Sequence, residues 1–182
     1  ARAWRPAVVA RLAQTLGLRV KLSAMRTVWT SGLLALALLA GLAWYLSPLE
    51  PGVVALQLAF TPRAFGEVIH FWSPEDLLRY RRHLPVDLLL LAAYGSFGYL
   101  LVTRTSVFSS SSQPLRRVAS WLLPLAAFFD AMENALHWWL TEVPRFAVPS
   151  VYAASASFSF LKWALIVGFG LLVAYALSRA EA

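Results

Sequence analysis

The chain has 182 residues, of which 59% are hydrophobic and 14% charged, and its 16 Lys and Arg against 9 Asp and Glu give a net charge of +7. Soluble domains average about 45–50% apolar and about 25% charged residues, so this composition argues against a soluble enzyme, a disordered tail or a nucleic-acid-binding domain. The sequence contains no cysteine, which excludes disulfide frameworks, cysteine-ligated metal sites and thiol catalysis. We therefore predict a small integral membrane protein.

The N-terminal arm, residues 1–27, is strongly basic, and no acidic residue precedes Glu50. Apolar residues between positions 8 and 20 recur at helical spacing, which predicts an amphipathic helix on an anionic lipid surface. A frayed or partner-bound arm is the alternative. The residues that we expect to bind lipid headgroups, with bound phospholipid such as cardiolipin as a candidate ligand, are Arg5, Arg11, Arg19, Lys21, Arg26, Arg116 and Arg117.

Four apolar stretches, at 28–46, 85–102, 118–140 and 155–177, are long enough to cross a hydrocarbon core of about 30 Å. They predict an all-α fold in which residues 1–182 form one membrane domain, a four-transmembrane-helix bundle with an amphipathic N-terminal helix. In the first loop, Thr61-Pro62 and Ser73-Pro74 each place a capping hydroxyl before a first-turn proline, which predicts short helices near 62–71 and 74–83. Gly95, Ser96 and Gly98 predict a close helix contact.

The distribution of basic residues predicts the orientation of the four spans. The N-terminal arm, the loop 103–117 and the tail together carry ten Lys and Arg, against five in the two other loops. Because Lys and Arg are retained on the inner side of a bilayer, we expect both termini to lie on that side.

Polar residues line one face of the third predicted span. Asp130, Glu133, Asn134 and His137 fall within an arc of about 100° on a helix. Ionisable side chains at membrane depth cost at least about 2.5–3.5 kcal/mol each and normally face partners inside a bundle. The fourth span carries Lys162 at the depth of Glu133, so we expect an ion pair between them. In the second span, Asp87 is a candidate contact for His137.

The same face is compatible with several functions. Metal binding requires matching ligands from facing helices, and only Asp87 is available, so we predict no metal or other cofactor. Haem ligation by two histidines fails because His70 and His83 fall in the outer loop. A proton relay or acid–base catalysis on a lipophilic substrate, by Glu133 and His137 with Asp130, stays open. A polar stripe that only orients helices is the simplest interpretation. Three serines of the fourth span line a polar pocket near Lys162 or mark close packing: Ser155, Ser157 and Ser159.

The stretch between residues 56 and 134 contains several short motifs: Leu56-Gln-Leu-Ala-Phe60, Phe65, Trp72, Tyr80-Arg81, Asp87, Tyr94-Gly95 and Asp130-x-x-Glu133-Asn134. In these motifs the chain resembles a group of uncharacterised four-span membrane proteins of bacterial type. The resemblance implies the four-span fold and carries no activity.

These features lead us to expect a non-catalytic accessory subunit of an energy-transducing membrane complex, such as a mitochondrial respiratory-chain complex or ATP synthase. Its partners would be other membrane subunits and anionic phospholipid. An arm rich in Arg and Ala and free of acids is typical of mitochondrial proteins near a presequence cleavage site, which favours the inner membrane with both termini in the matrix. A bacterial inner membrane or a thylakoid is the alternative location. The alternative function is a stand-alone membrane enzyme or lipid-binding protein with isomerase-like acid–base chemistry.

Overall fold

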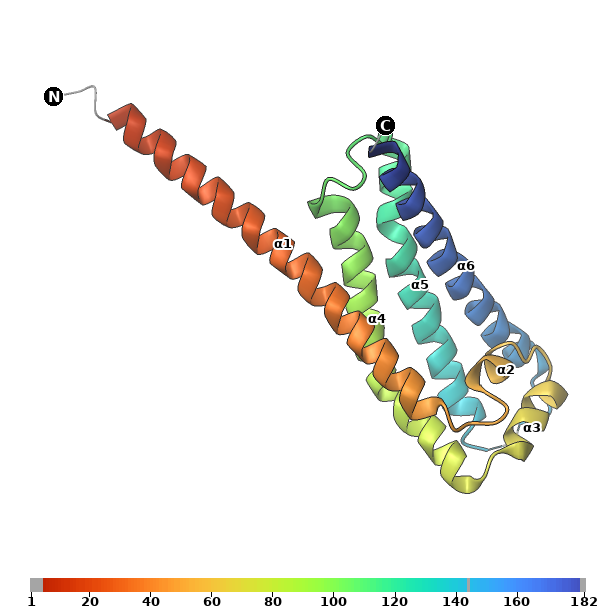
Figure 1. Ribbon diagram of the computed structural model, residues 1–182. Coiled ribbons are helices and arrows are strands. Elements are labelled where there is room, and N and C mark those ends of the chain that lie inside the picture. The colour runs from red at the N-terminus through yellow and green to blue at the C-terminus, as the bar shows by residue number, and fades with distance from the viewer. Residues whose placement is uncertain (1–4, 144, 181–182) are drawn as a thin grey trace.

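The computed structural model describes residues 5–143 and 145–180, and their side chains from 25 to 179 apart from residue 144. Its regular elements are helices: α1 (Arg5–Leu46), α2 (Val53–Gln57), α3 (Pro62–Phe71), α4 (Pro74–Arg104), α5 (Gln113–Leu140) and α6 (Pro149–Ala180). Four of them are long, and the two short ones lie in the connection between α1 and α4 (Figure 1).

The four long helices form an open row. Helix α1 packs on α4, α4 on α5 and α5 on α6, and within the described part of the chain no other pair of long helices makes a comparable contact. Figure 1 shows the same order across the molecule. Consequently α4 and α5 are covered on two sides, whereas α1 and α6 form the edges of the row.

In the part of the chain that the structure describes, three helices are long and apolar enough to cross a membrane: Met25–Leu46 of α1, Pro74–Arg104 and Pro149–Arg179. Each contains one of the predicted spans and extends beyond it. Helix α5 contains the predicted span 118–140 and has the necessary length, but its polar residues lower its hydropathy. The structure thus shows an all-helical protein with the features of a membrane protein.

Helix α1 continues without a break from the N-terminal arm into the first predicted span, so the arm is not a separate helix. Its 42 residues correspond to about 63 Å at about 1.5 Å per residue. The C-terminal half contacts α4 through a small apolar cluster that includes Ala35, Leu42, Leu90 and Ala93. The backbone of the N-terminal half extends away from the other helices (Figure 1).

Helix α4 begins at Pro74, so residues 74–83 are its first turns and not the separate short helix that the sequence predicts. Ser73 caps it: the Ser73 hydroxyl accepts a hydrogen bond from the Asp76 amide, and Asp76 in turn accepts from the Ser73 amide. Pro85, which we expected to begin the second span, lies inside α4. A well-capped N-terminus and packing on both sides sustain the helix across this proline.

Glycine brings α4 and α5 close together. A Cβ atom at Gly98 would lie 2.6 Å from Cβ of Leu123, and one at Gly95 would lie 3.3 Å from Cβ of Ala127. Ser96, the third residue of the predicted small-residue face, is exposed. Two glycines one helical turn apart therefore allow the backbones of the two central helices to approach.

The segment 47–73, with α2 and α3, covers one end of the α4–α5–α6 row. Its apolar residues form a core with the ends of the long helices, made of Leu49, Leu56, Ala59, Phe65, Val68, Trp72, Tyr80, Leu84, Leu140 and Tyr152. The Trp72 indole donates a hydrogen bond to the Pro51 carbonyl (2.9 Å), which closes the segment on itself. This cap buries the polar side chains at the adjacent end of α5.

Candidate functional site

The polar face of α5 is buried between its two neighbours. Helical spacing places Asp130, Glu133, Asn134 and His137 on one side, and all four side chains are buried, with Glu133 wholly inaccessible. Residues of α4 and α6 supply most of their contacts. We call these four residues, together with Lys162, Asp87, Tyr80 and Tyr94, the polar cluster.

Lys162 is the cation of the polar cluster and contacts two carboxylates. Its Nζ atom lies 2.7 Å from Oδ1 of Asp130, to which it donates a hydrogen bond, and 2.7 Å from Oε2 of Glu133. Its side chain is 5% exposed. An ammonium group so enclosed requires close anions, because each buried charge costs several kcal/mol of desolvation. These two contacts join α5 to α6.

His137 lies between an acid and a phenol. Its Nδ1 atom is hydrogen-bonded to the Tyr80 hydroxyl and lies 3.8 Å from Oε1 of Glu133. If the Tyr80 hydroxyl donates, Nδ1 is the acceptor and the proton of the neutral imidazole sits on Nε2. The Phe65 ring of the cap packs edge-on against the imidazole, with 5.5 Å between the ring centroids. The carboxylate and the phenol thus lie against the same imidazole nitrogen, Nδ1, and Nε2 has no hydrogen-bond partner among the described residues.

Two further hydrogen bonds join α4 to α5. Asn134 donates to Oδ2 of Asp87 (2.6 Å), and the Tyr94 hydroxyl donates to Oδ2 of Asp130 (3.3 Å). Asp87 thus bonds to Asn134 and not to His137, the contact that the sequence suggested. The reason is the register of α4: Tyr80, two turns before Asp87, reaches the imidazole first.

Some buried polar atoms of this region have no hydrogen-bond partner among the described residues, and they include His137 Nε2 and Ser155 Oγ. Helices α5 and α6 are antiparallel, and Lys162 of α6 contacts Asp130 of α5. Ser155 lies seven residues before Lys162 and His137 seven residues after Asp130, so the side chains of Ser155 and His137 lie at the same level. Of the other two serines, Ser159 is buried and donates to the Ser155 carbonyl (3.1 Å), whereas Ser157 is exposed. No group of three His, Asp or Glu side chains that could hold a metal ion occurs among the described residues.

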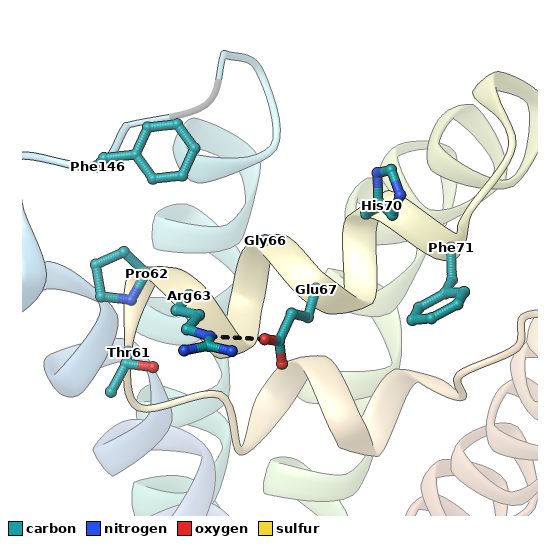
Figure 2. Close-up of a pocket in the computed structure, with 8 residues that line it drawn as sticks. All are labelled: Thr61, Pro62, Arg63, Gly66, Glu67, His70, Phe71 and Phe146. Carbon is teal, nitrogen blue, oxygen red and sulfur yellow. Dashed lines mark hydrogen bonds and ion pairs between the residues drawn. The ribbon is translucent and has the colours of Figure 1, made fainter.

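A shallow cavity of about 800 Å³ lies on the outer side of α3, away from the polar cluster. Figure 2 shows its lining: Thr61, Pro62, Arg63, Gly66, Glu67, His70, Phe71 and Phe146. Arg63 donates to Glu67 (2.8 Å), and this hydrogen bond and the attraction between the two charges raise the pKa of the guanidinium. Because the Arg63 guanidinium and the Glu67 carboxylate already pair with each other, the cavity offers a ligand mainly apolar contacts.

Of the basic residues predicted to bind lipid headgroups, Arg26, Arg116 and Arg117 are exposed. They make no ion pair with any residue that the structure describes. The side chains of the other four lie outside the described residues: Arg5, Arg11, Arg19 and Lys21.

Sequence reasoning placed Asp87 of α4 in the site and missed three other residues of this helix, Tyr80, His83 and Tyr94. His83, which we placed in the outer loop, is buried with its Nδ1 bonded to the Tyr80 carbonyl. The sequence held a signal for these residues, because positions 80, 83, 87 and 94 share one helical face, as the polar residues of α5 do.

Searches against protein-family models, curated proteins and solved structures found no significant match for the chain.

Proposed function

We propose that the protein is a non-catalytic accessory subunit of a larger membrane complex, which it helps to assemble and stabilise. The observation that carries this proposal is the open row of helices, whose edges expose large apolar side chains. On α1, Trp29 and Trp44 are 62% and 80% exposed, and on α6, Leu171 is 67% exposed. In a row, unlike a closed bundle, both edge helices can pack along a neighbouring subunit.

In this proposal the polar cluster has a structural role. Its ion pairs and hydrogen bonds join α4, α5 and α6. Between transmembrane helices there is little hydrophobic driving force, so polar contacts and close packing have to hold the helices in register. The cluster would keep the core of the subunit rigid while the edges bind partners.

We further propose that α5 is a fourth span and that both termini lie on the inner side. Helix α5 connects the end of α4 to the start of α6 and lies between them (Figure 1). If α4 and α6 cross the bilayer, a helix of 28 residues packed between them returns through it. The excess of basic residues at the end that carries Arg104, Arg116, Arg117 and Arg179 favours the inner side for this end.

The energy-transducing membrane, and the mitochondrial inner membrane in particular, is the location that we propose. Its support is the sequence of the arm, which is rich in Arg and Ala and free of acids. A location in a bacterial inner membrane or a thylakoid would leave the proposed role in assembly unchanged.

Native gel electrophoresis of the tagged full chain in mild detergent tests the role. We expect migration with a large assembly, whose other bands are identified by mass spectrometry. Trp44→Ala combined with Leu171→Ala should reduce the assembled fraction, because it trims both edges of the row. Leu89→Ala, at an exposed position of the central helix α4, is the matched control and should leave the assembly intact. Migration of the wild-type chain as a free monomer would overturn the proposal.

A second candidate, a stand-alone membrane enzyme or lipid-binding protein, is favoured by one specific observation. His137 Nε2 and Ser155 Oγ are buried, unpartnered and level with each other, next to Glu133. Such groups suit an acid–base reaction on a lipophilic substrate. An enzyme would run alone on the native gel and would lose turnover on Glu133→Gln or His137→Ala with its helix content unchanged.

A further inference from the structure

A small cavity of about 300 Å³ lies between the end of α4 and the start of α5. Its lining residues come from both helices: Val102 and Thr103 from α4, and Gln113, Arg116, Arg117 and Ser120 from α5. The cavity is at the opposite end of these helices from the cap formed by segment 47–73. It shares no residue with the polar cluster.

The cavity combines two cations with hydrogen-bond donors. Neither Arg116 nor Arg117 forms an ion pair with a described residue, and the sequence has no acidic residue between Asp87 and Asp130. The hydroxyls of Thr103 and Ser120 donate to backbone carbonyls (2.7 and 2.8 Å), so their protons are already in use, and the Gln113 amide is the side-chain donor beside the two guanidinium groups. Free guanidinium groups and the Gln113 amide are suited to bind the oxygens of a phosphate.

Apolar side chains continue from the cavity along the same two helices. Tyr99 lies one turn before Thr103 on α4, and Trp121 lies one turn after Arg117 on α5. The two rings contact each other edge-on, with their centroids 6.0 Å apart, and are 43% and 54% exposed. Tyr and Trp at such positions are typical of the membrane interface, where one part of the ring faces headgroups and the other faces acyl chains.

From this arrangement we infer that the cavity binds one anionic phospholipid. The phosphate contacts Arg116 and Arg117, and an acyl chain lies along Tyr99 and Trp121. Charge favours an anionic lipid, since two unpaired cations meet no carboxylate among the described side chains. The inference rests on the proposed crossing of the bilayer by α4 and α5, and it does not depend on membership of a complex.

Native mass spectrometry of the purified full chain tests the site. The probes are phosphatidylglycerol and phosphatidylcholine with the same acyl chains, added in equal amounts. We expect the wild type to retain one phosphatidylglycerol in preference to phosphatidylcholine. Because a basic residue near an anionic lipid surface strengthens binding about fivefold, Arg116→Gln with Arg117→Gln should lower this preference roughly 25-fold.

The matched control removes two charges elsewhere. Arg104→Gln with Arg179→Gln removes two other exposed arginines at the same end of the row, and the preference should stay within about twofold of the wild type, since neither residue lines the cavity. Equal losses in the two double variants, or no loss on Arg116→Gln with Arg117→Gln, would overturn the inference.

Fluorescence quenching places the acyl chain independently. Phosphatidylglycerol with brominated chains should quench the wild type more than the Trp121→Phe variant, because Trp121 is the tryptophan next to the cavity. Equal quenching would overturn the placement of the chain. All these measurements use the isolated protein. A free monomer on the native gel would therefore refute the accessory role and leave the lipid site unaffected. A wild type without preference for phosphatidylglycerol would refute the lipid site and leave the accessory role unaffected.

Discussion

Replacement of Lys162 by Met would remove the cation that two buried carboxylates share. Lys162 Nζ lies 2.7 Å from each of Asp130 and Glu133, and no other described cation contacts them as closely. Removing one partner of a buried ion pair typically costs about 3–5 kcal/mol, because an uncompensated charge is left behind. We expect Lys162→Met to lower the free energy of unfolding by this amount.

Unfolding in mixed micelles of mild detergent and dodecyl sulfate, followed by circular dichroism, gives the required free energies. The triple variant Lys162→Met, Asp130→Asn, Glu133→Gln buries no net charge at these three positions and should be more stable than Lys162→Met alone. Arg179→Met, an exposed basic residue of the same helix, should stay within about 0.5 kcal/mol of the wild type. The charge-exchange variant Glu133→Lys with Lys162→Glu should recover part of the free energy of unfolding that Lys162→Met loses.

Two results would refute this reasoning. One is a Lys162→Met variant within about 1 kcal/mol of the wild type, well below the usual cost of an orphaned buried charge. The other is a triple variant as unstable as Lys162→Met, which would show that the methionine disturbs packing and that charge is irrelevant.

Three other substitutions test separate contacts, each by the same unfolding assay. Tyr80→Phe should cost about 1–3 kcal/mol, because it leaves Nδ1 of buried His137 unpaired; a cost near zero would show that this bond is not formed. Gly98→Ala should cost about 1–3 kcal/mol by overpacking, and less in a Leu123→Ala background; an additive result would contradict the close contact. Trp72→Phe should cost about 0.5–1.5 kcal/mol and speed hydrogen exchange in the segment 47–73; unchanged exchange would mean that the indole bond does not hold the cap.

Composition and periodicity were enough to predict an all-helical membrane protein. Long apolar runs need lipid or a partner whatever their tertiary arrangement, which is why the candidate spans of α1, α4 and α6 contain the predicted ones. The polar face of α5 was also visible, since spacing alone places Asp130 and His137 on one side.

The partners of that face were harder to predict. The sequence suggested Glu133 as the partner of Lys162, and the structure gives Lys162 both Asp130 and Glu133. Register between helices decides such contacts, and it depends on packing such as that of Gly98, which a single sequence does not specify. The start of α4 was misplaced for a local reason: a proline at position 85 looked like a helix start, although the Ser73 cap had already begun the helix.

The continuous helix α1 has a mechanical consequence. Among the side chains that the structure describes, those of its C-terminal half pack on α4, and the backbone of the N-terminal half extends about 30 Å beyond this contact. A tilt of about ten degrees at this contact would displace the far end by about 5 Å, a distance close to one turn of a helix.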